Sequence, residues 1–481
     1  MNIFDVLERL GTLKSRNYSR ARLKANFTQY PDIWKAHYRG DVAGINQDTA
    51  WNGEDFYPVI RRSMRLAKLI AQRWVTLLFT EAFTVTLKDD TETEKFRQLE
   101  KQIDFRSKIN QAALWGYSEG TSALLASADI EIVEGAATQV VGGKVKLDCV
   151  KYENLYPLAF DKDDIQSIAF VKQEQEKDKT IYTISIHTSA GAGQVEIENI
   201  IATVKGEQVD FTAAETVTQS QTFNNQMYAW IKPNIVNDFS DILPFGQSIF
   251  ADALAPIVDV DLAADGLRRD LEESPQLTFV GRDMFLAQME GEKRKKVLDN
   301  SRGKFFIIPQ KLGEQGSDIK QLFERVTPEI RTEAFWQVVK DSLDWATMTS
   351  GLGHGSLDVS PRQTATQTVY LEAEKMQNKS LHEQYLEGQI IKIVKALCEL
   401  STLTGNLIDA SEVNIVWSDS VIVDTNTEKK VSLQEIDARV LSKSEYRERY
   451  MGESPEEAAA KIAAMVKEDD LFNFQRLTDD I

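Results

Sequence analysis

The stretch between residues 245 and 369 constrains the fold more than any other part of the sequence. Over residues 248–274, apolar residues mostly recur at three- and four-residue steps, which predicts a helix with one buried stripe. Pro256 lies inside this segment and predicts a kink or a late helix start, because proline lacks the backbone N–H of the helical ladder. A second helix is predicted over residues 328–350. Two helices separated by a long insertion therefore dominate the middle of the chain.

The insertion between these helices is predicted to contain strands. The runs 277–280 and 304–309 are rich in apolar, β-branched and aromatic residues. They flank a polar, charged segment that carries a basic run of Lys293, Arg294, Lys295 and Lys296.

A glycine-rich loop over residues 351–363 follows the second helix. Gly351 is placed where a helix commonly ends, and the loop runs through Pro361. A helical pattern then continues from about Thr364 to about Leu403. Helices of this length are uncommon in compact domains. They suit an assembly in which one element reaches across a large particle.

Several short motifs lie where the predicted elements begin or end. They are Trp34, Tyr38 and Gly40; Leu77, Leu78, Phe79, Thr80 and Glu81; Pro244, Gly246 and Ser248; Thr364, Ala365, Thr366 and Gln367; and Gly452, Ser454, Pro455, Glu456 and Glu457. With these motifs and this order of elements, the chain resembles portal proteins of tailed bacteriophages, of the kind common in phages of Gram-positive bacteria. The resemblance covers nearly the whole chain. Gln367 departs from the Thr-Ala-Thr-Glu-like run that portals often carry at the start of the long helix.

The resemblance implies an α+β portal fold, in which helices and an antiparallel sheet occupy separate parts. Its expected parts are a wing over residues 1–247, β-rich at about 128–230; stem helices over 248–274 and 328–350; a small α/β clip over 275–327; a tunnel loop over 351–363; a long wing helix and return over 364–426; and a helical crown over 427–481. Ser248, Ser444 and Ser454 are the expected N-terminal caps or starts of helices.

The resemblance also places candidate functional residues in three of these parts. The tunnel-loop residues are Gly351, Gly353, His354, Gly355, Ser356, Asp358 and Ser360. The clip residues, expected to contact a motor or an adaptor, are Lys293, Arg294, Lys295 and Lys296. The channel-facing candidates on the stem are Asp261, Asp265, Arg268, Arg269 and Lys340. A plain interhelical loop and an ordinary solvated basic loop stay open as alternatives for the first two groups.

A metal site is disfavoured at the acidic residues of the first stem helix. Only Asp261 and Asp265 share a helix face there, and no histidine lies nearby in the sequence. A solvated or channel-facing acidic face is the expected arrangement. Neither the two cysteines, Cys149 and Cys398, nor any other motif indicates a disulfide scaffold, a zinc site or a cofactor.

The charge of the chain argues against tight binding to DNA. The 74 acidic and 56 basic residues give a net charge of −18, whereas tight binding needs clustered lysine and arginine. A conduit through which DNA slides should avoid deep electrostatic traps, and net negative charge repels phosphate. An acidic surface that only keeps the protein soluble explains the same composition.

The function implied by the resemblance is that of a ring at one capsid vertex, through which DNA is packaged and ejected. The implied partners are eleven further copies of the chain, the terminase large subunit, a head-completion adaptor, the major capsid and scaffolding proteins, and double-stranded DNA in transit. The implied location is the virion, after assembly in the host cytoplasm. No G-x-x-x-x-G-K-[ST] motif occurs, so ATP hydrolysis by a P-loop is not expected in this chain.

Two other functions fit parts of the sequence. A head–tail adaptor would also form rings, but adaptors are usually much shorter. A serine hydrolase is suggested by the G-x-S-x-G pattern from Gly116 to Gly120, but that chemistry needs a strand before Ser118 and a helix after it. The sequence predicts the reverse order. An N-terminal helical face, which includes Ile3, Val6 and Leu7, is expected to dock on protein rather than on a membrane.

Overall fold

The computed structural model describes most of the chain, in two compact units, Met1–Val416 and Trp417–Ile481. The described residues are 3–10, 20–41, 49–51, 55–58, 62–80, 83–133, 139–161, 164–191, 194–213, 221–239, 245–273, 277–281, 304–308, 323–326, 329–357, 365–417, 432–436, 438, 441–451, 454 and 457–465. The basic run 293–296 and the loop residues Asp358 and Ser360 lie outside them.

Helices from the first part of the chain pack against one another, and one of them contacts the long helix α9 (Ala365–Leu403). They are α2 (Arg20–Arg39), α3 (Leu66–Phe79), α4 (Asp90–Gln102) and α5 (Phe105–Glu119). Helix α4 begins after Asp89, whose side chain accepts a hydrogen bond from the Glu92 backbone N–H, as an N-cap does. Trp34, singled out in the sequence, is buried and packs edge-on against Phe239.

The strands between residues 122 and 231 form two antiparallel sheets. The three-stranded sheet has the order β12-β4-β5, with β4 (Ser122–Val133), β5 (Gln139–Lys151) and β12 (Tyr228–Ile231). In the six-stranded sheet, strands β6 to β10 lie side by side in the order of the chain, and β11 also pairs with β9. These strands are β6 (Leu155–Asp161), β7 (Asp164–Glu176), β8 (Lys179–Gly191), β9 (Gln194–Lys205), β10 (Gln208–Ala213) and β11 (Gln221–Phe223). This hairpin order is the one that short turns between alternating runs predict.

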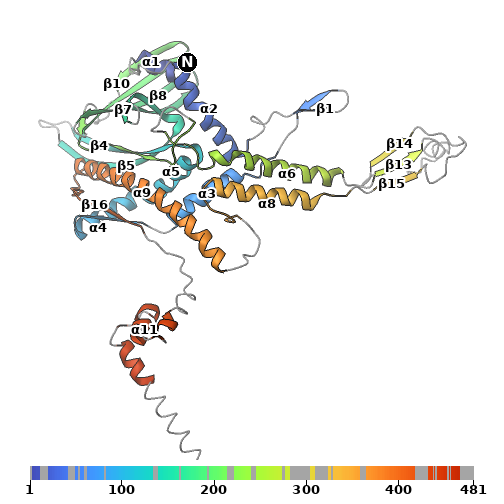
Figure 1. The fold of residues 1–481 in the computed structure, drawn as a ribbon. Helices are drawn as coiled ribbons and strands as arrows, with labels where there is room; N and C mark the ends of the chain where they lie inside the picture. The colour runs from blue at the N-terminus through green and yellow to red at the C-terminus, as the bar shows by residue number, and fades with distance from the viewer. Residues whose placement is uncertain are drawn as a thin grey trace, which may run out of the picture. The chain divides into compact units, whose positions relative to one another are not determined.

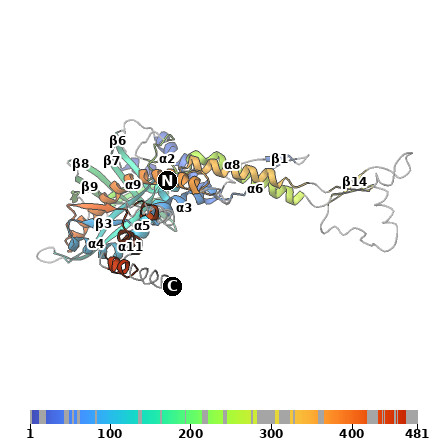
Figure 2. The ribbon, with the colours of Figure 1, turned by 60° about the horizontal axis from the view of Figure 1, so that its bottom comes forward.

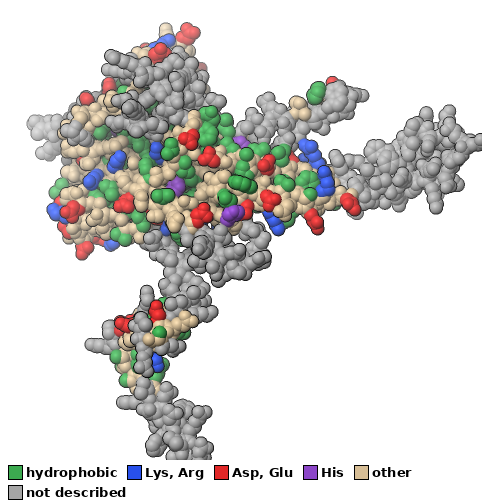
Figure 3. Space-filling model, viewed as in Figure 1, with side chains coloured by type: hydrophobic (Ala, Val, Ile, Leu, Met, Phe, Trp, Pro, Cys, Tyr) green, Lys and Arg blue, Asp and Glu red, His purple; other side chains and the backbone are tan. Residues whose placement is uncertain are grey.

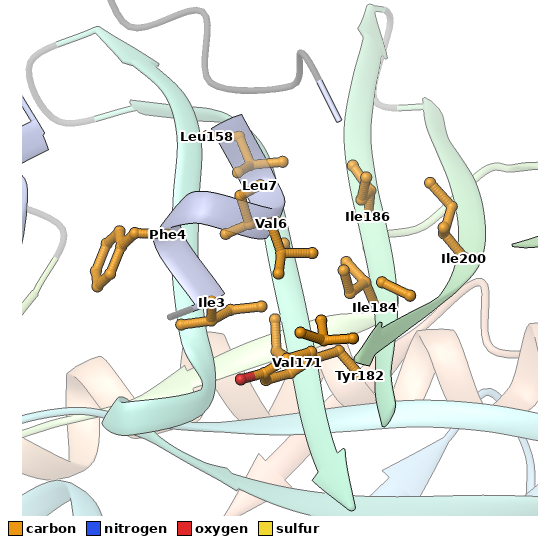
Figure 4. Packing of buried hydrophobic residues seen from close by; sticks show 13 residues of the cluster. Ile3, Phe4, Val6, Leu7, Leu158, Val171, Tyr182, Ile184, Ile186 and Ile200 are labelled. Atoms are coloured by element: carbon orange, nitrogen blue, oxygen red, sulfur yellow. The ribbon is translucent and has the colours of Figure 1, made fainter. Parts of the chain in front are cut away.

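Helix α1 (Ile3–Arg9) docks on the six-stranded sheet, as Figure 4 shows. Val6 and Leu7 are fully buried, in a cluster that also contains Val171, Ile184 and Ile186. The apolar face of this helix is therefore covered by the chain's own sheet, which confirms the prediction of docking on protein.

Ser118 lies near the end of a helix, not at a strand-to-helix turn. Helix α5 precedes it and strand β4 follows it, and its hydroxyl donates to the Trp115 carbonyl (3.3 Å). Gly120 follows the helix with a φ of 91°, a conformation that favours glycine. The pattern from Gly116 to Gly120 thus ends a helix and makes no nucleophile elbow.

Two helices, α6 (Leu254–Glu273) and α8 (Thr332–Thr349), lie side by side, and the chain runs out along one and back along the other (Figures 1 and 2). Helix α6 starts six residues later than the sequence predicted, with a short 3-10 turn, η2 (Ala251–Ala253), before it. Pro256 is accordingly in the first turn of α6, where its missing N–H costs no helical hydrogen bond. Ser248 caps no helix and instead donates from its hydroxyl to the Tyr117 carbonyl (3.2 Å).

Three strands occupy the described part of the insertion between α6 and α8. Strand β13 (Leu277–Gly281) pairs in parallel with β14 (Lys304–Ile308) and antiparallel with β15 (Phe323–Val326). The first two strands were expected from the sequence and the third was not. Helix α9 begins at Ala365 and ends at Leu403, which confirms its predicted length.

The remaining strands of the first unit form two small sheets. Strand β1 (Thr49–Trp51) pairs with β2 (Phe56–Pro58), and β3 (Thr84–Leu87) pairs with β16 (Val413–Val416). Residues 413–425 are rich in β-branched residues, a pattern that predicts a strand pair. The described part of that range instead contains the single strand β16, whose partner lies more than three hundred residues earlier.

The second unit contains helix α11 (Lys443–Met451) and a helical segment over residues 457–465. The N-cap of α11 is Ser442 and not Ser444: its hydroxyl accepts from the Glu445 N–H (3.1 Å), and the Glu445 carboxylate accepts from the Ser442 N–H (2.9 Å). Ser454 and Glu457 make the same reciprocal pair, which confirms Ser454 as a cap.

Helices and antiparallel sheets in separate parts of the chain make this an α+β fold, as predicted. Among the described residues, no helix combines the length and the apolar character that crossing a bilayer requires.

Substitution of Gly116 by alanine tests how closely α5 packs on β12. A Cβ atom at residue 116 would lie 2.2 Å from the Ile231 carbonyl oxygen. We expect Gly116→Ala to lower the free energy of unfolding by about 1–3 kcal/mol, because the backbone must shift. Urea unfolding followed by circular dichroism measures this change.

Gly388→Ala in α9 is the matched control, because no atom lies within 4 Å of a Cβ placed there. It should raise the free energy of unfolding by about 0.5–1 kcal/mol, the preference of a helix for alanine. Equal effects of the two substitutions would contradict the close α5–β12 contact.

Candidate functional site

The candidate site consists of the α6–α8 pair and the segment that joins α8 to α9. The two helices approach closely at Gly266, where a Cβ atom would lie 2.5 Å from the Phe335 ring. Near the start of α8, Arg331 makes two hydrogen bonds to the Asp270 carboxylate (2.9 and 2.8 Å), and these lower the pKa of Asp270. The Arg331 guanidinium also lies over the Phe335 ring, 5.1 Å from its centroid.

The two acidic candidates on α6 are buried, which differs from the solvated face expected. Asp261 and Asp265 are only 5% and 6% exposed. The Asp261 carboxylate accepts from the Met64 N–H (2.6 Å), and that of Asp265 from the Arg62 N–H (3.4 Å). Burial raises the pKa of Asp261. These carboxylates therefore anchor the segment that leads into α3. The expectation that they face a channel stays a prediction.

The basic candidates lie at different depths. Arg269 and Lys340 are exposed, whereas Arg268 is half-buried. Whether any of them faces a channel stays a prediction, because that depends on neighbouring copies of the chain.

Helix α8 carries large apolar side chains in solvent on two different sides. Trp336 is 53% exposed and Trp345 is 61% exposed. They are nine residues apart, so at about 100° per residue they point in opposite directions across the helix. Val338, seven residues before Trp345, is exposed on the Trp345 side.

The loop after α8 is folded back onto the last turns of that helix. The Asp344 carboxylate accepts from the Gly355 N–H (2.9 Å) and contacts His354 Nδ1 (2.8 Å). Gly351, Gly353 and Gly355 all have positive φ angles, between 66° and 80°, which other residues rarely adopt. The glycines in this loop are thus required by its backbone.

The end of α8 is attached to the body of the protein by one buried and one half-buried donor. Trp74 Nε1–H of α3 donates to the Ser350 carbonyl (2.8 Å), and Asn378 of α9 donates to the Gly351 carbonyl (2.9 Å). The His382 ring packs on Trp74, with 4.7 Å between centroids.

His382 is a hydrogen-bond acceptor in this cluster. The Asn234 N–H donates to His382 Nδ1 (3.1 Å), and the Tyr117 hydroxyl lies 3.0 Å from the same nitrogen. Nδ1 must therefore carry a lone pair, which makes the imidazole neutral. Burial lowers the pKa of His382 to about 4, in agreement with this geometry.

Sequence reasoning did not identify the polar residues of α9 that hold this cluster and the strands beside it. They follow one side of the helix at steps of three, four or seven residues: Asn378, His382, Tyr385, Gln389, Lys392 and Glu399. We call them the polar stripe. Gln389 accepts from the Trp230 N–H (3.1 Å), and Glu399 accepts from the N–H groups of Asn224 and Asn225 (2.7 and 3.0 Å). Their spacing is the signal that would have found them.

Among the residues that the structure describes, no group of three or more His, Cys, Asp or Glu side chains is placed to hold a metal ion.

The neutral state of His382 predicts a pH dependence of stability. The folded pKa of about 4 lies below the ordinary value of 6.5, so between these values only the unfolded chain takes up the proton. Stability should therefore be complete above pH 6.5 and fall as the pH drops towards 4, by on the order of 3 kcal/mol.

Urea unfolding at pH 7.5 and pH 4.5 measures this loss, and His382→Gln separates it from that of other groups. The glutamine can still accept from the Asn234 N–H but does not titrate. An equal loss of stability in both proteins would show that His382 is not its source.

A protein-family model matches most of the chain. Its description is "Phage portal protein, SPP1 Gp6-like", and the match spans residues 16–470. No curated protein matches the chain. The match covers nearly the whole of both the six-stranded-sheet part and the α6–α8 pair described above. Portal proteins are ring-forming structural components of the virion capsid. The chain therefore belongs to the phage portal protein family of the SPP1 Gp6-like type.

Proposed function

We propose that this protein forms the ring at one capsid vertex through which phage DNA is packaged and later ejected. In this proposal the ring has twelve subunits and is assembled in the host cytoplasm. It nucleates the procapsid with the scaffolding and major capsid proteins, and it serves as the docking platform for the terminase motor and then for a head-completion adaptor. Family membership supports the proposal.

The observation that carries the ring is the pair of exposed tryptophans on opposite sides of α8. Tryptophan is enriched at protein interfaces, so these exposed side chains support surfaces that another chain covers. Figure 3 shows hydrophobic side chains interspersed with charged ones along the paired helices. A helix that exposes apolar side chains on two opposite sides can contact one neighbouring subunit through each side.

Two different contact sides on one subunit are what a closed ring requires. In a ring the subunits meet head to tail, so one side of each subunit contacts the other side of the next. We assign the Trp336 side of α8 to one neighbour and the Trp345–Val338 side to the other. The α6–α8 pair then forms the stem of the ring.

The remaining candidate residues take roles that follow from this placement. Arg269 and Lys340, exposed on the stem, are the proposed channel-facing residues. The segment 351–363 is the proposed tunnel loop, with its first residues held by Asp344. The proposed motor or adaptor contact is the basic run at residues 293–296. The net charge of −18 limits retention of DNA in passage.

Substitution of Trp345 by glutamate tests the ring. A carboxylate in a closed apolar contact would be desolvated without a partner, so we expect ring formation to weaken by roughly tenfold or more. Negative-stain electron microscopy and mass photometry of the purified protein measure the fraction in rings. Wild-type rings should enclose a hole wide enough for duplex DNA.

Phe211→Glu is the matched control. Phe211 is also an exposed aromatic residue, but it lies on β10, in the sheet at the other end of this unit from α8 (Figure 1). Rings of this control should equal those of wild type. If Trp345→Glu forms as many rings as the wild type, α8 is not part of the subunit contact. If the wild-type protein forms no ring even in the presence of its scaffold, the proposed function is contradicted.

A further inference from the structure

A groove of about 720 Å³ lies between helices α3 and α5. Leu69, Arg73 and Phe79 of α3 line one side of it, and Asn110 and Leu114 of α5 line the other. Among the described residues of its lining, Arg73 is the only charged one. The groove therefore presents apolar and neutral polar side chains of two helices, with a single cation beside them.

The charge of Arg73 has no partner in the part of the chain that the structure describes. Its side chain is exposed and makes no hydrogen bond or ion pair there. Leu69, one helical turn earlier on the same side of α3, is 40% exposed. Arginine and apolar side chains that lie together in this way are enriched where another protein binds.

The Trp345 side of α8 has the complementary pattern. Val338, Asp341, Trp345 and Met348 recur at steps of three, four and three residues, so they follow one side of the helix. All four side chains are exposed. Three of them are apolar, and Asp341 carries the only charge among them. An amphipathic helix with anchors at this spacing is the element that an apolar groove between helices binds.

Both surfaces lie near the same end of α8. Trp74, which stands between the groove residues Arg73 and Val75, donates to the Ser350 carbonyl at the end of α8 (2.8 Å). Trp345 is five residues before Ser350, or about 7.5 Å along the helix. Subunits of a closed ring are related by rotation, so two surfaces that meet must lie at the same level along the ring axis. Nearness to one attachment point favours this arrangement.

We propose that the α3–α5 groove of one subunit receives the Trp345 side of α8 from the next subunit. Trp345 is the buried anchor of this contact, and Asp341 pairs with Arg73. A second copy of the chain is the occupant because it supplies a helix with matching spacing, opposite charge and an exposed tryptophan. The charge pair fixes the register of an otherwise apolar contact.

This contact rests on the ring proposed above and names the surface that receives α8. It puts the groove and the Trp336 side of α8 on one face of the subunit and the Trp345 side on the other. One face of each subunit then meets the other face of the next, as a head-to-tail ring requires.

Photo-crosslinking from the groove identifies its occupant. Replacement of Leu69 by p-benzoylphenylalanine keeps an apolar side chain there, and irradiation of purified rings links it to the segment that lies against it. We expect a covalent dimer on a denaturing gel, and mass spectrometry should locate the link in α8, at residues 338–349. The same replacement of Phe211 is the matched control and should give no link to α8.

Exchange of the two charges tests the pairing of Arg73 with Asp341. Arg73→Glu and Asp341→Arg each place like charges opposite each other, so each should lower the fraction of protein in rings by roughly tenfold. The double variant restores an opposite pair and should return this fraction to within roughly twofold of wild type. Mass photometry measures the three fractions. Recovery in the double variant also excludes misfolding as the cause of the losses.

Lys101→Glu is the matched control for the charge exchange. It makes the same change of charge at an exposed residue of α4 that does not line the groove, so its rings should equal those of wild type. The proposal is overturned if the Leu69 probe in intact rings links to another segment, such as residues 417–481, or gives no dimer. It is also overturned if the double variant assembles no better than the single variants. In each of these cases the wild-type rings remain, so the proposed function is not contradicted.

Discussion

The structure depends on how the end of α8 is attached to the rest of the protein. A helix leaves its last carbonyl groups without partners, and here Trp74 and Asn378 satisfy those of Ser350 and Gly351. These two donors come from α3 and α9, so one point joins the paired helices, the first helices of the chain and the long helix. The position of α8, the start of the glycine-rich loop and the direction of α9 all follow from it.

Carboxylates in this acidic chain have two distinct uses. Many give the surface its net negative charge, whereas others accept backbone N–H groups that would otherwise lack partners. The buried Asp261 and Asp265 hold the segment before α3, and the half-buried Asp344 and Glu399 hold the loop after α8 and residues 224 and 225. A carboxylate bonded to backbone amides fixes loops that have few apolar residues of their own. Composition alone does not separate these two uses.

The sequence predicted the long elements well and the local anchors poorly. Helix α9 and strands β13 and β14 follow from periodicities that the burial of apolar side chains imposes. Asp261 and Asp265 resembled a solvated face, because charged residues are seldom buried and their backbone partners lie about two hundred residues away. Ser248 and Ser444 are residue types that often cap helices, but neither lies at the start of its helix. Helix α6 starts close to Pro256, and the Ser442–Glu445 pair caps α11. The proposed contact of α8 with other subunits does not follow from the periodicity of one chain, because the same apolar residues fit a core as well as an interface.

The polar stripe of α9 has a mechanical consequence. A packed apolar stripe depends on the shapes of its side chains. A stripe of hydrogen-bonding groups also needs each donor to meet its acceptor, so it fits its partners in one register only. Displacement of α9 by a single helical turn, about 5.4 Å, would take Asn378, His382, Gln389 and Glu399 away from their backbone partners together. Helix α9 therefore packs on the strands beside it in a single register. Any motion imposed on the glycine-rich loop must move the long helix and its sheet as one body, or else must be absorbed within the loop itself.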